Sequence, residues 1–309
     1  MKKLISLFAL LFVASVFLLH CGSNPVTSPE TASPKLTPDN LQATPAALEK
    51  GNGAEKVYIL HLTGNGEYIL IQVAPNAVPA HLAHGDILVP CAPSYQQGFE
   101  ASTDGWFDSN SGWYGLATQV SSGTGGIVSS AGSGHAVMEG DASSAPYSIF
   151  DGYCDSWTPW TAELDVYLDP SWSTSQGFDY TVAATGSDGA HQRDFIFHVN
   201  KDASTGKLLV AGSNNTNFAP REDLENINHY EVTTAGWYTL QHVFYESGGA
   251  LAVDLNLLDS GGNVLFTETR TNASDVIPDE VGGNRYAWFT FINVDGGVAV
   301  DEFEIFRHY

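Results

Sequence analysis

Basic side chains are scarce in this sequence of 309 residues, where 12 lysines and arginines stand against 35 acids and leave a formal net charge of −23. So acidic a chain repels phosphate groups, which argues against nucleic acids and anionic lipid surfaces as partners. It is compatible with divalent cations, with neutral polysaccharide, or with solubility alone. Charged residues are also few, at 15%, whereas glycines number 31. This composition favours an extracellular all-β fold with many turns over a helical or disordered chain.

Familiar catalytic motifs and long helices are absent as well. No Ser-His-Asp arrangement, phosphate-binding loop or zincin motif stands out in the sequence. No helix of ordinary length is predicted, although residues 221–227 are compatible with one or two helical turns. The features that remain as indications of function are ligand-binding residues, metal ligands and paired carboxylates.

The first residues have the pattern of an export signal, because two lysines precede a run over residues 4–19 that is apolar except for two serines. The following residues, HCGSN, resemble the bacterial lipoprotein signal, although that family has a small residue where His20 stands. The resemblance implies a signal over residues 1–21 that ends at a lipidated Cys21. The chain would then be anchored at the bacterial cell envelope, such as the outer membrane, through lipid alone. Plain secretion is the alternative, and the apolar run is short for a retained membrane span.

Cysteine is rare, with three residues in the chain. If Cys21 carries lipid, Cys91 and Cys154 remain in an oxidising compartment, where they are expected to form a disulfide. Two separate free thiols are the alternative. Residues 22–54 are rich in Ser, Thr and Pro without a periodic apolar pattern, and they are typical of an extended tether.

A small hairpin unit is predicted over residues 55–90. Two strands, at 57–62 and 68–73, flank a Thr-Gly-Asn-Gly turn, and a single helical turn follows at 79–84. The unit resembles a short module of secreted bacterial proteins whose pattern is roughly V-C-H, then G-N-G-x-y-H, then A-H-L-x-H-G-D. That resemblance brings no function with it.

The hairpin unit contains a candidate zinc site. His81 and His84 are spaced to share one face of a turn, and His61 and Asp86 are near in sequence; these are zinc-ligand types. A histidine-capped structural turn is the alternative. Two positions that are Cys and His in the module are apolar in this chain, which counts against a metal: Leu60 and Ile69.

The rest of the chain, residues 95–309, has the pattern of a β-sandwich. Its clearest part is a meander over residues 236–269, in which two glycine turns join three strands. In the middle strand Leu and Val alternate with Asp and Asn, so one face is apolar and has to stack against a second sheet. A strand at 160–169 alternates in the same way, and turn residues recur roughly every ten residues.

Short motifs at both ends of this domain extend the prediction. The opening GFEASTDGW and the closing VAVDEFEIF resemble the jelly-roll carbohydrate-binding and concanavalin A-like (LamG-type) modules of secreted bacterial proteins. The resemblance implies a jelly-roll sandwich of two antiparallel sheets. It also implies a structural calcium ion between the first and last strands, where Glu100 and Asp301 stand. An ordinary solvated acid pair is the alternative. The segment 236–266 also resembles an uncharacterised family of secreted sandwich domains, which brings no activity with it.

Polysaccharide or a glycoconjugate is the expected partner, because sugars stack on exposed rings and bond to amides, acids and guanidinium groups. Three tryptophans near polar loops are expected to be exposed: Trp157, Trp160 and Trp172. Trp237 and Trp288, within alternating strands, are expected in the core. Polar residues inside strands offer a second surface: Arg193, His198, Gln241, Asp254 and Asn256. Arg193 and Arg285 are expected to have specific partners, either a ligand or structural acids.

Hydrolysis is the competing prediction. Glu163 and Asp165 alternate onto one face of a strand, as the paired carboxylates of retaining glycosidases require. Against this, the third acid of the jelly-roll glucanase pattern is displaced to Asp169 at the strand end. We therefore predict a surface protein that recognises extracellular carbohydrate without catalysis. A glycoside hydrolase and a structural or adhesive domain are the alternatives, and the oligomeric state is left open.

Overall fold

The computed structural model describes residues 56–309, except 90, 92–93, 108, 111–112, 141–145, 149–155 and 217–220. The predicted signal, lipidation site and tether lie outside the described residues, as does Cys154. Cys91 is disulfide-bonded. Its partner lies outside the described residues, so the pairing with Cys154 stays a prediction. No helix among the described residues is long and apolar enough to span a membrane.

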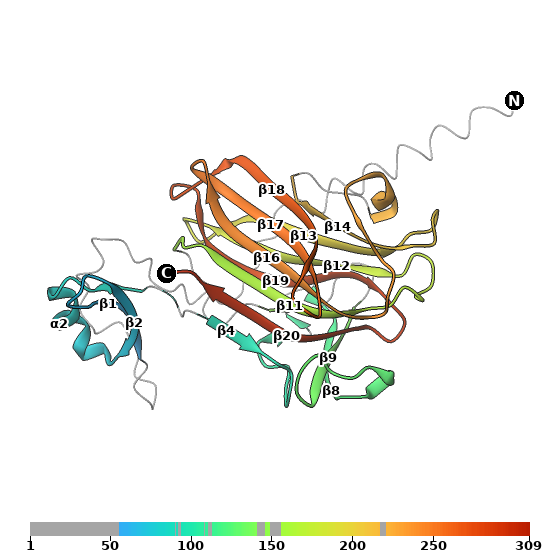
Figure 1. Cartoon of the computed structure of the whole chain (residues 1–309), viewed down its shortest axis with the longest axis horizontal. Helices are drawn as coiled ribbons and strands as arrows, with labels where there is room; N and C mark the ends of the chain where they lie inside the picture. Colours follow the sequence, from blue (N-terminus) through green and yellow to red (C-terminus); the bar gives the residue numbers. More distant parts are fainter. Residues whose placement is uncertain are drawn as a thin grey trace, which may run out of the picture. The chain divides into compact units, whose positions relative to one another are not determined.

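The hairpin unit has three antiparallel strands in the order β2-β1-β3 (Figure 1). β1 is Val57–Leu62, β2 is Tyr68–Val73 and β3 is Ile87–Leu88. Between β2 and β3 lie the short helices η3 (Pro75–Ala77) and α2 (Val78–Ala83). The turn after β1 closes through a hydrogen bond from the Gly66 N–H to the Thr63 carbonyl, at 2.9 Å, and Gly66 adopts a φ of 86°. The predicted hairpin and helical turn are thus confirmed.

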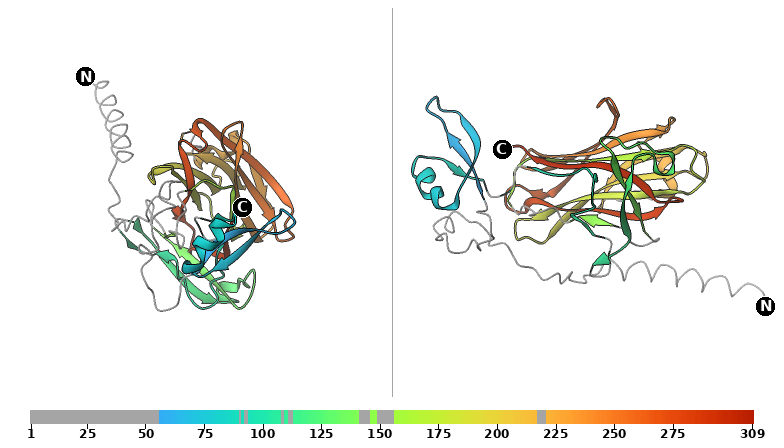
Figure 2. Two further views of the ribbon diagram at one scale, coloured as in Figure 1. Left: turned by 90° about the vertical axis from the view of Figure 1, so that its left-hand side faces the viewer. Right: turned by 90° about the horizontal axis from the view of Figure 1, so that it is seen from below.

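The main domain is a sandwich of two antiparallel sheets, seen from two further sides in Figure 2. One sheet has seven strands in the order β15-β14-β13-β12-β19-β10-β5. Its strands are β5 (Trp106–Phe107), β10 (Tyr147–Ser148), β12 (Gly177–Gly186), β13 (His191–Lys201), β14 (Leu208–Asn214), β15 (Tyr230–Val232) and β19 (Val281–Asn293). The predicted fold class, an all-β jelly-roll sandwich, is confirmed.

The other sheet has eight strands, seven of them in the order β18-β17-β16-β11-β20-β9-β8, while β4 pairs with the second half of β20. Its strands are β4 (Ser94–Gln97), β8 (Leu116–Ser121), β9 (Gly134–Glu139), β11 (Trp160–Leu168), β16 (Gly236–Ser247), β17 (Ala250–Asp259), β18 (Val264–Val276) and β20 (Val298–Arg307). The small pair β6 (Ser109–Asn110) and β7 (Trp113–Tyr114) and the 3₁₀ turns η4 (Thr124–Gly126) and η5 (Arg221–Asn226) complete the domain.

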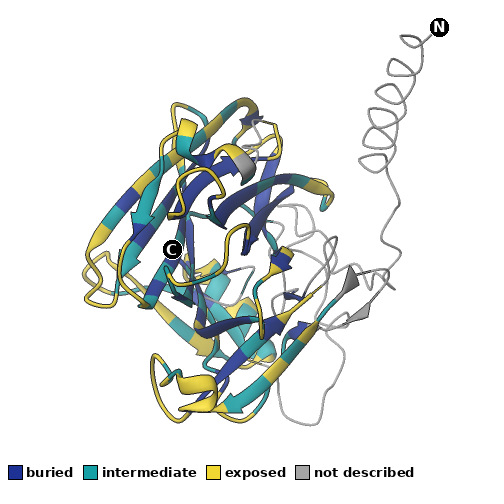
Figure 3. Ribbon diagram, turned by 90° about the vertical axis from the view of Figure 1, so that its right-hand side faces the viewer, coloured by how far each residue is buried: buried dark blue, intermediate teal, exposed yellow. Residues whose placement is uncertain are grey.

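The core lies between the two sheets, where apolar residues alternate inward along each strand. In β11 the even-numbered residues from Trp160 to Leu168 are buried and the odd-numbered residues from Glu163 are half-buried. Figure 3 shows this alternation as bands along the strands. The Trp160 ring stacks on Phe244 of β16, with ring centroids 3.6 Å apart. Trp160 is therefore a core residue, and the prediction that it is an exposed ligand-binding ring is wrong.

The two sheets differ in how their outer faces are covered. Strands β12 and β14 are buried along their whole length on both faces. Outside the seven-stranded sheet, Leu224 of η5 packs on Leu209 and Ala211 of β14 in a small second core. The outer face of the eight-stranded sheet instead keeps its side chains half-exposed on β11, β16 and β17. That face is the larger candidate surface for recognition.

We expect Trp160→Ala to lower the free energy of unfolding by about 3–5 kcal/mol, because it leaves a cavity between the sheets. Trp172→Ala, at a half-buried ring, should cost clearly less. Chemical denaturation monitored by far-UV circular dichroism measures both values. An equal, small loss of stability in the two variants would contradict the assignment of Trp160 to the core.

Candidate functional site

A row of polar side chains crosses the outer face of the eight-stranded sheet. Its members are mutual partners in the strand register, one from each of six strands: Gln96, Glu304, Glu163, Gln241, Asn256 and Thr267. We call these six residues the polar row. Because side chains alternate between the faces of a strand, residues in register across a sheet share one face. The register thus gathers residues that lie more than 200 positions apart in sequence, since Gln96 bonds to Glu304 at a separation of 208.

Hydrogen bonds connect neighbours within the polar row in two stretches that meet at the paired residues Glu163 and Glu304. The Thr267 hydroxyl donates to Asn256 Oδ1 at 2.7 Å, and Asn256 Nδ2 donates to Gln241 Oε1 at 2.8 Å. Gln241 Nε2 then donates to Glu163 Oε1 at 2.6 Å. On the other side, Gln96 Nε2 donates to Glu304 Oε1 at 2.5 Å. Each amide is therefore fixed in orientation, and the two facing glutamates each receive a neutral donor.

Two further acids lie beside the polar row, and each receives hydroxyl groups. Asp254 Oδ1 accepts hydrogen bonds from the Thr269 hydroxyl at 2.6 Å and from the Tyr245 hydroxyl at 3.2 Å. Asp165 accepts from the Thr239 hydroxyl at 2.6 Å. The predicted placement of Asp254 and Asn256 on one accessible face is confirmed, and so is that of Glu163 and Asp165.

Aromatic rings flank these polar groups. Tyr167 of β11 and Trp237 of β16 are register partners, with ring centroids 5.6 Å apart in an edge-to-face contact. The Trp237 indole N–H donates to the Val128 carbonyl at 2.7 Å, and both rings are half-exposed. The prediction that Trp237 is a core residue is thus wrong. It has the parity of Thr239 and Gln241, which point outward, rather than that of buried Leu240.

The predicted loop site does not present free rings. Trp172 is half-buried between β11 and β12 and contacts Phe178 edge-to-face, with centroids 6.4 Å apart. Trp157 is also half-buried and packs against the sandwich core, while the neighbouring residues 151–155 lie outside the described part. Trp288, predicted in the core, is half-buried and contacts Tyr286 edge-to-face. None of these rings joins the polar row.

Arg193 serves the fold rather than a ligand. Its buried guanidinium makes two parallel hydrogen bonds to the Asp275 carboxylate of β18, of which Nη2 to Oδ1 spans 2.6 Å. Its Nη1 donates to the Thr216 hydroxyl at 3.1 Å. The prediction of Arg193 as a ligand-binding residue is therefore corrected to a structural ion pair. Arg285 likewise donates to a backbone carbonyl, that of Gly189, at 2.7 Å.

Glu100 and Asp301, the predicted calcium ligands, both bond to the loop of residues 130–133. Glu100 Oε2 accepts from the Ser133 N–H and hydroxyl, each at 2.8 Å. Asp301 Oδ2 accepts from the Ala131 N–H at 3.2 Å. N–H donors face both carboxylates, and the Ser133 hydroxyl also faces Glu100, so the described donor set does not fit a calcium ion held between them. The loop itself ties these two segments together. The calcium site stays a prediction without support from this geometry.

Three acids in this region have displaced pKa values. Burial raises the pKa of Asp301 to about 6, although N–H groups of the neighbouring loop partly oppose the shift. Hydrogen bonds from Ser133 lower the pKa of Glu100. Glu302 follows Asp301 with a φ of 45° at an irregularity in the register. Burial raises the pKa of Glu302, as do the negative charges of Asp165 and Glu100.

The raised pKa of Asp301 predicts a pH dependence of stability. The carboxyl titrates near 3.8 when unfolded and near 6 in the fold, so between these values the folded state binds more protons. Stability contributed by the protonated form is present below about pH 4 and is lost as the pH rises through 6. Relative to Asp301→Asn, we expect the wild type to lose free energy of unfolding between pH 4 and pH 7. Parallel stability curves from denaturant titrations would contradict this.

A buried Asp–His–Ser network lies under η5, on the outer face of the seven-stranded sheet. The prediction that His198 belongs to a binding surface is wrong, because its ring is fully buried, and its contacts with Asp179 and Ser213 were not predicted. His198 Nδ1 is 2.8 Å from Asp179 Oδ1, and His198 Nε2 is 2.6 Å from the Ser213 hydroxyl. Arg221 Nε also lies 3.2 Å from Asp179 Oδ1. The order of contacts is that of a nucleophile, base and acid. However, all three side chains are fully buried, and a substrate cannot reach Ser213 in this state.

We expect Ser213 to have a structural role. Ser213→Ala removes a partner of the buried His198 ring and should lower the free energy of unfolding by about 1–3 kcal/mol. The native protein should not react with a fluorophosphonate probe, which modifies accessible activated serines. Labelling of the folded wild type that disappears in Ser213→Ala would show instead that this serine is a nucleophile.

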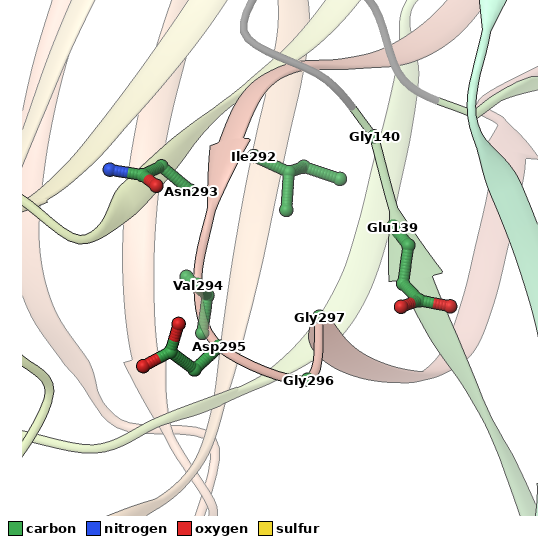
Figure 4. Close-up of a pocket in the computed structure, with 8 residues that line it drawn as sticks. All are labelled: Glu139, Gly140, Ile292, Asn293, Val294, Asp295, Gly296 and Gly297. Carbon is green, nitrogen blue, oxygen red and sulfur yellow. The ribbon is translucent and has the colours of Figure 1, made fainter.

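A shallow hollow of about 210 Å³ lies at the turn between β19 and β20 (Figure 4). It is lined by residues 292–297 of that turn and by Glu139 and Gly140 at the end of β9. Its Asn293 amide donates to the Ser175 carbonyl at 3.1 Å. The carboxylates of Glu139 and Asp295 come from different segments, and no ring is among the lining residues. This hollow offers fewer recognition groups than the polar row.

In the hairpin unit the structure brings His81 to His61 and Asp86 rather than to His84. Nδ1 of His61 and Nδ1 of His81 lie 2.8 and 2.6 Å from the same Asp86 Oδ2. Burial would raise the pKa of the Asp86 carboxyl, but hydrogen bonds from His61, the Leu62 N–H and His81 outweigh it and hold the pKa well below its usual range. His84 caps the end of α2 and is exposed. The predicted pair of His81 and His84 is thus corrected.

No protein-family model and no curated protein matches this chain. Among solved structures, the lectin I from Ulex europaeus in complex with the methyl glycoside of α-L-fucose aligns with a TM-score of 0.38 at 10% identity, over 69% of this chain and 98% of the lectin. The Ca²⁺/Man2-bound VIP36 exoplasmic/lumenal domain aligns at 0.40 and 10%, over 70% and 88%. The CBM2 module of the Lactobacillus casei BL23 phage J-1 evolved Dit aligns at 0.37 and 13%, over 70% and 97%. We draw no functional argument from likenesses this distant.

Proposed function

We propose that the outer face of the eight-stranded sheet binds carbohydrate without catalysis, at the polar row and the rings beside it. The observation that carries this proposal is the row itself, a line of amides and carboxylates held in register on a half-exposed surface. Sugar hydroxyls bond to amides and carboxylates, and the C–H faces of sugar rings pack on aromatic side chains. Tyr167, Trp237 and Tyr245 supply rings of that kind on the same face.

The hydrogen bonds within the polar row favour binding by preorganisation. Ordering a long side chain on binding costs about 0.5–1.5 kcal/mol. Gln241 and Asn256 are already ordered, because each both donates and accepts within the row. Their remaining lone pairs and N–H groups are left for hydroxyl groups of a ligand. A flat line of this kind suits an extended polysaccharide better than a single sugar.

The charge on this face favours a neutral ligand. The carboxylates of Glu163, Glu304, Asp165 and Asp254 all lie on or beside the polar row. They would repel uronic acids and sulfated sugars, since like charges at close range raise the free energy of binding. We therefore favour neutral glucans, mannans or similar polymers over acidic polysaccharides.

The cellular setting is part of this proposal and rests on the sequence. A lipid on Cys21 and the tether over residues 22–54 would hold the sandwich at the outer surface of a bacterial envelope, where extracellular polysaccharide is present. The large negative charge agrees with a role outside the cell and away from nucleic acids.

Binding of neutral polysaccharides should depend on the polar row. Gln241→Ala and Asn256→Ala should each weaken binding about 5- to 10-fold, because each removes hydrogen bonds worth about 1 kcal/mol. Isothermal titration against polysaccharides selected on a glycan array measures the change in the chain from residue 22 to 309. Trp172→Ala tests the loop site, and Asn226→Ala, which removes an exposed amide on η5 outside the other sheet, serves as the matched control.

Three results would contradict this assignment. Loss of binding in Trp172→Ala with none in Gln241→Ala would move the site to the loops. Release of reducing sugar that stops in Glu163→Gln would identify a glycoside hydrolase that uses Glu163 and Asp165. The absence of binding to every glycan tested would favour a structural or adhesive domain.

A further inference from the structure

Three side chains of metal-ligating type meet in the hairpin unit. His61 stands near the end of β1, His81 lies on α2, and Asp86 follows that helix. Candidate ligand atoms of all three lie within 4.8 Å of one another, and among the described residues they form the one group of three or more His, Cys, Asp or Glu with this property. Segments separated by 25 residues thus place two imidazoles on one carboxylate.

The carboxylate is rigidly placed and the rings are reachable. The Asp86 side chain is fully buried, and its Oδ1 accepts the Leu62 N–H at 2.9 Å. The side chains of His61 and His81 are 33% and 25% exposed. Their rings meet edge-to-face, with centroids 5.6 Å apart and an interplanar angle of 84°. The two Nδ1 atoms therefore converge on Oδ2 from different directions, and each ring keeps an edge toward solvent.

We propose that His61, His81 and Asp86 bind a divalent transition metal of the zinc type, through the two Nδ1 atoms and Asp86 Oδ2. Zinc binds imidazole nitrogens and carboxylate oxygens at about 2.0–2.2 Å, with water in an open fourth position when the protein supplies three ligands. In the metal-free unit both Nδ1 atoms lie within hydrogen-bond distance of Oδ2, which accepts from each ring when that ring carries its proton on Nδ1. On metal binding, each neutral ring would carry its proton on Nε2 instead, and the metal would take the place between the three atoms.

The small core of the hairpin unit gives such a metal a role. Within the described residues 56–89, the buried hydrophobic side chains are those of Ile59 and Val89. Units below about 40 residues usually need a disulfide or a metal to fold stably. Cys91 supplies a disulfide next to the unit. A metal would join β1 to α2 and to the segment that leads into β3, and its binding free energy would stabilise this arrangement.

Zinc titration of the metal-free chain from residue 22 to 309 tests the site. We expect one zinc ion per chain by isothermal titration and a higher melting temperature of the unit with zinc. His61→Gln and His81→Gln keep an amide donor for Asp86 but remove a ligand, so they should weaken zinc binding about 100-fold or more, since losing an outer-shell partner already costs about 10–100-fold. His84→Gln, an exposed histidine in the same unit, should leave affinity unchanged.

A second measurement keeps the test decisive if a variant does not fold. In wild-type protein with ¹⁵N-labelled histidine, zinc should shift the Nδ1 resonances of two histidines and leave the His84 ring unchanged. Equal zinc affinity in wild type and His61→Gln, an equal loss of affinity in His84→Gln, or no binding at 100-fold excess zinc would each overturn the proposal. In those cases the histidines and Asp86 form a hydrogen-bonded structural cluster only.

Discussion

The register of β11 between β16 and β20 is the constraint on which the polar row depends. Because side chains alternate at every residue, a shift of one position would turn Glu163 inward and Leu164 outward. Burial of Trp160, Ala162, Leu164 and Val166 prevents that shift, since large apolar side chains such as those of Leu164 and Val166 each contribute about 1.5–3 kcal/mol when they are removed from water. The polar row therefore exists because the core beneath it is apolar. The outward-facing residues are aligned across the strands by the packing of the inward-facing ones, although they are not part of the core themselves.

Much of this sheet could be predicted from local sequence. The alternation in residues 160–168 and 251–257 identified the strands and the face of Glu163, Asp165, Asp254 and Asn256. The prediction for Trp160 rested on its polar neighbours and that for Trp237 on its place in an alternating strand, and neither used the residue's parity within the strand. Trp160 has the parity of Leu164 and is buried, whereas Trp237 has the parity of Gln241 and is half-exposed. That signal was present in the sequence.

Other parts of the site could not be predicted, because they depend on pairing between distant segments. Gln96 and Glu304 become neighbours only when β4 joins the second half of β20. Asp179, His198 and Ser213 meet across three strands, and His61 reaches Asp86 only through the packing of α2 on β1. Likewise, nothing local to Glu100 or Asp301 indicates that the loop of residues 130–133 would bond to both. Spacing within a segment carries no information about such contacts.

The two outer faces of the sandwich differ in solvent exposure, and this difference limits where a ligand could bind. The outer face of the seven-stranded sheet is covered over β12 and β14, so polar groups there must pair with one another, as His198 does with Asp179 and with the Ser213 hydroxyl. A buried polar group without a partner destabilises the fold by more free energy than one hydrogen bond contributes to it. On the half-exposed face of the eight-stranded sheet, water can hydrogen-bond to amides and carboxylates. The hydrogen bonds within the polar row therefore need not use every lone pair. A ligand rich in hydroxyl groups can replace that water at little cost in free energy. A ligand could reach the covered face only after η5 had been displaced from it.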